Sequence, residues 1–186
     1  MKIFSIIAFA LIILAQWFVP LSIILKKETI TSKGKLFKFK TEPIDPSNPF
    51  EGKYITLNYQ QDTFSIALNT LPLLERGDDI YILLKQENGF AVIKDVVTKK
   101  PNGNIDYVKA TVRYIDNNND VLKLYIDYSF NKFFMQEYKA PKAESLYRDA
   151  NRNPEVNCYA VVSIYDGSAV VNDVMINEVS ISKLVK

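Results

Sequence analysis

The sequence predicts a mainly β fold, in which an N-terminal transmembrane helix is followed by a β-rich, barrel-like or sandwich-like domain with one short α-helix. Three observations lead to this prediction. No charged residue occurs from Ile3 to Leu25, and most of the remaining chain alternates apolar and polar residues with a period of two. Turn-forming pairs such as Asn88-Gly89 and Asp166-Gly167 separate the alternating runs. The 186 residues suit one domain of ordinary size beside the helix.

The apolar segment is expected to be a retained membrane anchor, residues 1–26. As a helix, its uncharged stretch spans ~34 Å, which exceeds the ~30 Å of a bilayer core. A cleaved signal peptide has a shorter apolar core and small residues at its cleavage site. A lipoprotein needs a cysteine directly after the apolar run, whereas the only cysteine here is Cys158. A buried core helix is the other alternative, but it would be polar on one face.

Residues 27–40 are expected to form a basic juxtamembrane stem that runs into the first strand. Residues 26–40 hold six lysines and one glutamate, a charge that suits anionic headgroups better than nucleic acid, and no nucleic-acid partner is expected. The positive-inside rule alone would place the following domain in the cytoplasm. A single N-terminal apolar segment, however, usually acts as an uncleaved export signal. We therefore expect a single-pass protein of the inner membrane with its folded domain in the periplasm.

Residues 41–186 are expected to form the β-rich domain. The expected strands are 35–41, 53–60, 64–68, 79–86, 90–98, 107–115, 121–128, 156–165, 168–176 and 178–184. One helix is expected from Pro141 to Asn153, because proline is favoured in a first helical turn and Pro154 follows directly. Leu146 is expected to face the core. A weaker helical turn is expected over residues 71–76.

The residue types exclude several chemistries. The chain has no histidine, which removes the commonest general base, the usual zinc ligand and every catalytic triad that contains histidine. The stretch "DNNND" lacks the glycine and glutamate of a calcium loop and is expected to be a turn. Cys158 is expected to be a small buried side chain. No metal site and no cofactor are expected.

Two enzymatic alternatives remain open. A serine–lysine dyad needs neither histidine nor metal, and Ser47 is the candidate nucleophile. Its candidate bases are Lys85, Lys94 and Lys109, among which the sequence does not choose. A carboxylate pair, Glu137 and Glu144, lies seven residues apart and could share one helix face. Neither arrangement has a supporting motif, so no catalytic residue is assigned.

The stretch "PIDPSNPFEGKYITLNY", residues 43–59, resembles the bacterial family named for its GDYXXLXY motif. The resemblance extends to "ERGDDIYILL", residues 75–84, and to "YSFNKFFMQEYKAPKAE", residues 128–144. It implies an N-terminal membrane anchor in an uncharacterised family whose members are often encoded beside polytopic membrane proteins of unknown function. It transfers no catalytic residues. The aspartate of the motif is Lys53 here, so a chemical role for that position is not expected.

The motif itself is interpreted as a structural corner. Period-two alternation places Leu57 and Tyr59 on one face of the strand, in the core, and Tyr54 on the other face. Asp45 is expected to bond local backbone amides, and Phe50 is expected to pack inward.

We expect a non-enzymatic binding or assembly module for a membrane partner. The residues of its candidate binding surface are Asp45, Pro46, Phe50, Gly52, Tyr54, Tyr59, Glu137 and Glu144. The alternatives are a β-barrel that encloses a small ligand and a hydrolase that works without histidine.

Overall fold

The computed structural model describes residues 2–43, 54–67, 74–103, 105–118 and 121–185. The helices are α1 (Lys2–Lys33), α2 (Ala140–Arg152) and α3 (Ile181–Leu184). The strands are β1 (Lys35–Glu42), β2 (Tyr54–Thr56), β3 (Asn58–Tyr59), β4 (Thr63–Ala67), β5 (Asp79–Glu87), β6 (Phe90–Val97), β7 (Tyr107–Asn118), β8 (Val121–Tyr128), β9 (Lys132–Phe134), β10 (Cys158–Tyr165), β11 (Ser168–Ile176) and β12 (Val179–Ser180).

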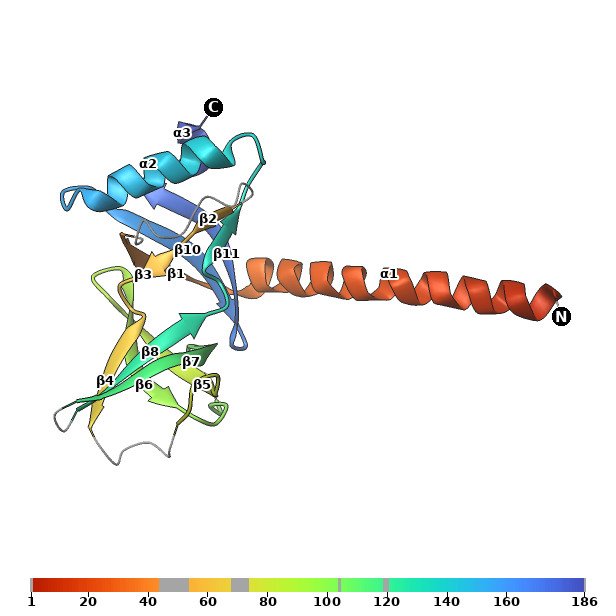
Figure 1. Cartoon of the computed structure of the whole chain (residues 1–186), viewed down its shortest axis with the longest axis horizontal. Coiled ribbons are helices and arrows are strands. Elements are labelled where there is room, and N and C mark those ends of the chain that lie inside the picture. The colour runs from red at the N-terminus through yellow and green to blue at the C-terminus, as the bar shows by residue number, and fades with distance from the viewer. Residues whose placement is uncertain (1, 44–53, 68–73, 104, 119–120, 186) are drawn as a thin grey trace.

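The strands form two five-stranded sheets and a two-stranded ribbon. One sheet has the order β12-β11-β10-β1-β3, the other has the order β4-β8-β7-β5-β6, and β2 pairs with β9. Neighbouring strands pair antiparallel throughout these sheets. Helices α2 and α3 lie on the side of the first sheet that faces away from the second sheet, and α1 projects from the region between the two sheets (Figure 1).

The strands follow from alternation of apolar and polar residues. In β1, Phe37 and Phe39 are buried while Lys40 is exposed, as a strand with one buried face requires. The two hairpin pairs noted in the sequence are turns with positive φ. Asn88 and Gly89 have φ of 52° and 81°, and Asp166 and Gly167 have 45° and 77°. These values match the left-handed central positions of a type I′ hairpin turn.

An aromatic cluster occupies the centre of the core, formed by Phe39, Tyr59, Tyr128 and Phe130. Their ring centroids lie 4.9 to 6.0 Å apart, mostly in tilted or edge-on geometry. The buried Tyr59 hydroxyl donates to the Phe130 carbonyl over 2.7 Å, and the Tyr128 hydroxyl donates to the Gln61 carbonyl over 2.6 Å. The rings therefore fill the interior while their hydroxyls remain hydrogen-bonded.

The β10–β11 hairpin turn joins the two sheets. The Lys109 amide donates to the Gly167 carbonyl over 2.8 Å, and Val108 forms a parallel bridge with Gly167. The Tyr107 hydroxyl donates to Asp166 over 2.6 Å. Strands β1 and β6 also contact each other. The result is a nearly closed, barrel-like arrangement with one continuous core.

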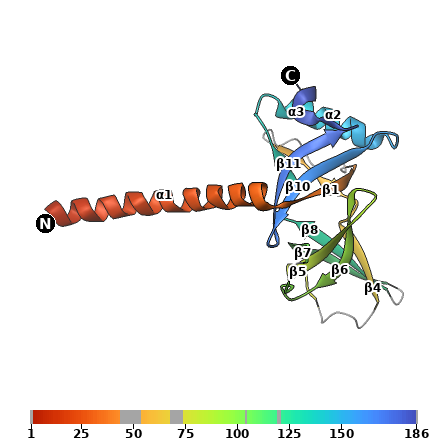
Figure 2. The same cartoon turned by 180° about the vertical axis from the view of Figure 1, so that it is seen from behind.

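Among its described side chains, helix α1 is packed at its C-terminal end. Ile30 is buried and Gly34 separates the helix from β1. A Cβ at Gly34 would overlap the Ile30 carbonyl oxygen, so only glycine fits there. The N-terminal part of the helix extends away from the β-domain in both views (Figures 1 and 2).

Among the described residues, no helix is both long and apolar enough to cross a membrane. The transmembrane anchor expected over residues 1–26 is therefore not supported by the structure. Helical residues 27–33 continue α1 without a break, and residues 35–40 of the expected stem lie in β1.

Most expected strands are present, and the differences lie at short elements. The expected strand 53–60 is divided, because Leu57 separates β2 from β3. Strand β9 was not expected. The expected strand 178–184 is wrong over most of its length, because Val179–Ser180 is its only strand part and Ile181–Leu184 forms a helical turn.

Helix α2 confirms the expected helix within one residue at each end. Its inward face differs from the expected one, because Ala143 and Tyr147 are buried while Leu146 is 37% exposed. Ala143 and Tyr147 are four residues apart and share a face, whereas Leu146 points away from it. Cys158 is buried, as expected. Part of the expected turn at 71–76 and the last two residues of "DNNND" lie outside the described residues, and the first three residues of "DNNND" belong to β7.

Candidate functional site

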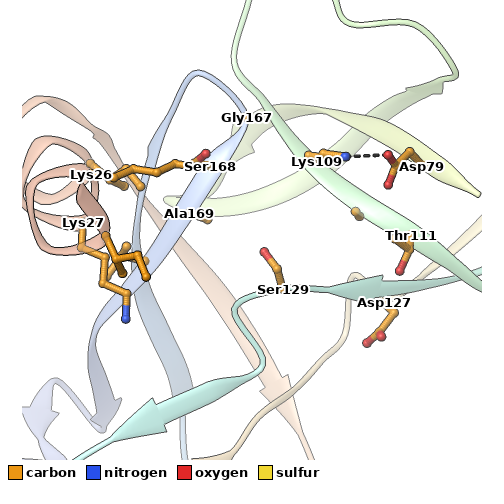
Figure 3. Close-up of a pocket in the computed structure, with 14 residues that line it drawn as sticks. Lys26, Lys27, Asp79, Lys109, Thr111, Asp127, Ser129, Gly167, Ser168 and Ala169 are labelled. Atoms are coloured by element: carbon orange, nitrogen blue, oxygen red, sulfur yellow. Dashed lines mark ion pairs between the residues drawn. The ribbon is translucent and has the colours of Figure 1, made fainter. Parts of the chain in front are cut away.

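The cleft at the foot of α1 is a concave site of about 660 Å³ (Figure 3). One wall is a face of α1 that carries Ile23, Lys26, Lys27 and Ile30. Their spacing of three, four and seven residues places all four side chains on the same side of the helix. This wall therefore combines isoleucine side chains with two ammonium groups.

The opposite walls come from both sheets. The β10–β11 hairpin contributes Gly167, Ser168, Ala169 and Val170, and the second sheet contributes Asp79, Lys109, Ala110, Thr111, Asp127 and the adjoining Ser129. Strand pairing places Asp79 opposite Thr111 in neighbouring strands, and Thr111 opposite Asp127. Three parts of the chain that are distant in sequence thus meet at one cleft.

The charges of the cleft are unevenly paired. Lys109 and Asp79 form an ion pair of 2.5 Å, and the hydrogen bond to Asp79 raises the pKa of Lys109 (Figure 3). Lys26, Lys27 and Asp127 form no ion pair with any described residue. Two cations and one half-buried carboxylate therefore remain available to a ligand.

Hydroxyl groups add neutral hydrogen-bonding capacity to the same cleft. Thr111, Ser129 and Ser168 each place a hydroxyl there (Figure 3). None of the three is hydrogen-bonded within the described parts of the chain. A hydroxyl can donate one hydrogen bond and accept two, so these groups suit a ligand with several oxygen atoms.

Half of the expected binding surface lies outside the described residues. This applies to Asp45, Pro46, Phe50 and Gly52, together with the expected local bonds of Asp45 and the inward packing of Phe50. The candidate nucleophile Ser47 and the substituted motif position Lys53 lie there too. The structure describes Tyr54, Tyr59, Glu137 and Glu144.

The two motif tyrosines have opposite environments. Leu57 and Tyr59 are buried, as the alternation predicted, and Tyr59 belongs to the aromatic cluster. Tyr54 is half-buried in β2, opposite Phe134 of β9, with the two rings 5.4 Å apart. The Lys132 ammonium lies 4.2 Å from the Tyr54 ring centroid and donates to its hydroxyl over 3.0 Å.

The Tyr54 environment is an aromatic and basic surface. Phe134 is 65% exposed beside Tyr54, and Tyr138 is exposed in the turn before α2. Aromatic residues are enriched at protein–protein contacts, whereas lysine is depleted there, so the exposed rings are the part of this surface that indicates a contact. We call Tyr54, Lys132, Phe134 and Tyr138 the aromatic surface.

The two candidate glutamates have different environments. Glu137 is exposed before α2, whereas Glu144 is half-buried on the helix. Burial raises the pKa of Glu144, and Arg148 opposes this effect. Its Oε2 atom, the Tyr147 hydroxyl and the Asn151 amide nitrogen are buried without a hydrogen-bond partner among the residues that the structure describes. No hydrogen bond or ion pair joins Glu137 to Glu144 in the described parts of the chain.

Two of the three lysines considered as general bases are held in ion pairs with carboxylates. Lys85 forms an ion pair with Glu87 over 2.6 Å, and Lys109 is paired with Asp79. Within the described ranges, no group of three or more cysteine, aspartate or glutamate side chains could hold a metal ion.

The sequence profile of the GDYXXLXY protein family matches residues 16–174. This match covers most of the chain, from the middle of α1 to β11. The chain belongs to the GDYXXLXY family. The comparisons with curated proteins and with solved structures found no match.

The matched region of this GDYXXLXY protein includes every residue of the cleft at the foot of α1. Sequence inspection missed this cleft. The spacing of Ile23, Lys26, Lys27 and Ile30 was the one local indication, since it marks a helix face. The other walls depend on sheet topology, which the sequence did not specify.

Proposed function

We propose that this GDYXXLXY protein is a membrane-attached, non-enzymatic binding or assembly module for an integral membrane protein. The observation that carries the proposal is the exposure of apolar side chains on α1. Large apolar residues at positions 9, 11–14, 17–19, 21 and 23–25 are each at least 39% exposed. Consecutive positions point around the whole helix, so the apolar surface is not limited to one face. Burial of such a surface is strongly favourable.

A lipid environment is what best covers the exposed apolar side chains of this helix. The proposal rests on the exposure of these side chains and not on the hydropathy of the described residues, which does not reach that of a spanning helix. Lys26, Lys27 and Lys33 follow the apolar part, where ammonium groups would meet lipid headgroups. We propose the inner membrane as the location and the periplasm as the compartment of the β-domain.

The aromatic surface is the proposed contact with the partner. It combines the motif tyrosine Tyr54 with the exposed Phe134 and Tyr138, and its cation Lys132 is held against Tyr54. Aromatic rings bury much area at low cost in side-chain entropy, which suits the centre of an interface. The filled aromatic core disfavours the alternative of a ligand enclosed in the barrel, since rings occupy the space that such a ligand would need.

Trp17 allows a direct test of membrane attachment. It is the only tryptophan of the chain and is 75% exposed on α1. After reconstitution into phosphatidylcholine vesicles, we expect its emission to shift to shorter wavelength and to be quenched by lipids with brominated acyl chains. The control is Trp17→Phe combined with Phe134→Trp, which moves the reporter to the β-domain and should be quenched much less. Water-like emission of Trp17 without quenching would contradict the proposal.

The partner contact can be tested by site-specific photocrosslinking in membranes. A photoreactive residue at Phe134 should give a discrete adduct with an integral membrane protein. The same residue at Tyr114, which is exposed on β7, is the matched control. Equal adducts from both positions, or none from Phe134, would contradict the assignment of the aromatic surface. A C-terminal reporter that is active only in the cytoplasm would overturn the proposed orientation.

A further inference from the structure

We propose that one face of α1, marked by Gln16, binds a transmembrane helix of an integral membrane protein whose end enters the cleft at the foot of α1. This inference rests on the proposed function and deepens it by assigning a helix face and a kind of partner segment. Ile23 and Ile30 belong to the α1 wall of the cleft. Gln16 lies seven residues before Ile23, so it continues the same side of the helix into the apolar segment.

The residues of this side lie within ~60° of Gln16 when each residue turns the helix by ~100°. We call them the Gln16 face: Phe9, Ile12, Gln16, Val19, Ile23, Lys27 and Ile30.

The amide of Gln16 is the reason to place a partner on this face. Its side chain is exposed and forms no hydrogen bond with any described residue. Ser22, in contrast, donates its hydroxyl hydrogen to the Val19 carbonyl over 2.7 Å within the helix. An unpaired amide is costly in hydrocarbon, and glutamine side chains in membranes form hydrogen bonds to neighbouring helices. A helix packed against this face would supply the missing bond.

The apolar residues around Gln16 provide the contact surface. Phe9, Ile12, Val19 and Ile23 are each more than half exposed. Packed helices lie 8–10 Å apart, so one neighbouring helix would cover all four side chains. Apolar residues surround α1 on every side and do not select a face by themselves. The selection comes from Gln16 at one end of this face and from the cleft at the other.

The cleft gives the partner helix a place to end. A helix of ~10 Å diameter fills roughly 420 Å³ per turn, so a cleft of about 660 Å³ has room for about one turn. The hydroxyls of Thr111, Ser129 and Ser168 line the cleft and are not hydrogen-bonded to any described residue. The end of a helix leaves backbone groups unpaired, and hydroxyls can donate to them or accept from them.

A second copy of this chain does not fit against the same face. At the foot of α1, the β10–β11 hairpin and the second sheet lie on the side of the helix that lines the cleft (Figure 3). In a parallel pair joined through Gln16, both β-domains would need the space between the two helices. A helix that ends at the cleft avoids this overlap. The occupant is therefore a segment of a different protein.

Site-specific photocrosslinking of the full chain in native membranes tests this face. The photoreactive residue is placed in turn at positions 12, 19 and 23 on the Gln16 face and at positions 14, 18 and 21 on the opposite face, all of them exposed. We expect an adduct with one membrane protein from the first set and much less from the second. Mass spectrometry of the digested adduct should locate the attached peptide in an apolar, membrane-spanning segment.

Three outcomes of this experiment would contradict the inference. Equal yields from both faces, or no adduct from the Gln16 face, would overturn the face. An attached peptide from outside a membrane-spanning segment would overturn the kind of partner segment. An adduct of twice the mass of the chain would show that the occupant is a second copy.

Gln16→Leu isolates the contribution of the amide. Leucine keeps α1 apolar, so membrane insertion and the quenching of Trp17 should persist while the hydrogen bond is lost. The adduct from position 23 should fall roughly threefold or more, the scale of one hydrogen bond between helices in a bilayer. Ser22→Ala is the matched control and should leave the yield unchanged, because the Ser22 hydroxyl is already bonded within α1. An unchanged yield in Gln16→Leu would overturn the role of Gln16.

Thr111→Phe tests the cleft without changing any charge. Its ring would occupy the space assigned to the end of the partner helix, so the adduct from position 23, beside the cleft, should decrease. Thermal unfolding of the variant checks that the fold is retained. A folded Thr111→Phe variant with an undiminished adduct would overturn the cleft as the place where the helix ends.

Two measurements separate this inference from the proposed function. If α1 does not enter the membrane, Trp17 is not quenched in the unmodified chain. If only the helix face is wrong, Trp17 is quenched and the adduct from Phe134 forms, while the two faces of α1 do not differ in crosslinking.

Discussion

The apolar residues of α1 and those of the β-domain differ in what they contact. Phe39 is fully buried among the aromatic rings of the core, whereas Phe18 is 71% exposed on the helix. Alternation places one set of apolar residues of each sheet in the core, where they pack on partners elsewhere in the chain. The continuous apolar surface of α1 has no such partner among the described residues, apart from its packed end at Ile30. The difference teaches that the β-domain is packed on contacts within the chain, whereas the described apolar side chains of α1 lie exposed, where the proposed lipid environment would cover them.

The largest expected effect compares two phenylalanines. Phe39→Ala should lower the free energy of unfolding by ~3–5 kcal/mol, because it leaves a cavity in the core. Phe18→Ala should change it by less than ~0.5 kcal/mol, because the exposed ring has no contact to lose. Denaturant unfolding of both variants in detergent gives the two values. Similar losses would mean that α1 packs on the β-domain in solution.

Two hairpin glycines allow the same comparison between a packed and an exposed position of the backbone. Gly167 and Gly89 have similar positive φ, but a Cβ at Gly167 would lie 2.6 Å from the Tyr107 ring, while nothing lies within 4 Å at Gly89. Gly89→Ala should cost ~1 kcal/mol of stability through backbone strain alone. Gly167→Ala should cost ~2–4 kcal/mol, because overpacking adds to that strain. Thermal unfolding measures both, and equal shifts would contradict the contact between the turn and β7.

The two motif tyrosines provide a smaller test. Tyr59→Phe leaves the buried Phe130 carbonyl without its donor and should cost ~1–2 kcal/mol. Tyr54→Phe removes a bond from an exposed lysine and should cost less than ~0.5 kcal/mol. Both variants keep the ring, so packing is unchanged. If Tyr54→Phe is the more destabilising change under the same denaturant titration, the assignment of Tyr59 to structure and Tyr54 to contact is reversed.

The smallest effect concerns the protonation of Cys158. Burial raises the pKa of its thiol to about 11, against ~8.5 in an unfolded chain. The folded state therefore binds the proton more tightly, and its stability falls as the pH rises from the unfolded value towards the folded one. Relative to Cys158→Ala, the unmodified chain should lose less than ~1 kcal/mol between pH 7 and pH 9. Chemical unfolding at the two pH values measures the difference, and an increase in relative stability would contradict burial of the neutral thiol.

Much of the β architecture could be predicted from local patterns. Alternation located β5, β8 and β11, and Asn-Gly and Asp-Gly pairs fixed two hairpins, because these features depend on neighbouring residues alone. Helix α2 was found from Pro141 and Pro154. Strand β9 has only three residues, too few for a period to be recognised. Residues 179–182 alternate as a strand would, but Ile181 and Leu184 are three residues apart, which is the spacing of a helix face, and Ile181 is buried.

The candidate sites were less accessible to sequence inspection. Lys132 meets Tyr54 across 78 residues of sequence, and the pairing of β2 with β9 had no local indication. The cleft at the foot of α1 joins a helix, a hairpin and a second sheet, so only one of its walls has a pattern of its own. Contacts between distant segments are set by topology, which residue spacing does not encode.

A single residue, Gly34, separates α1 from β1. Because so short a link leaves little freedom of rotation, it fixes how the β-domain is turned about the helix axis. Each residue of an α-helix advances it by about 1.5 Å and turns it by about 100°. Inserting one residue into α1 would therefore redirect the aromatic surface by more than a quarter of a turn, while an insertion of seven residues would nearly restore its direction. The number of residues in α1 therefore sets the direction in which the β-domain faces its neighbours around the helix axis.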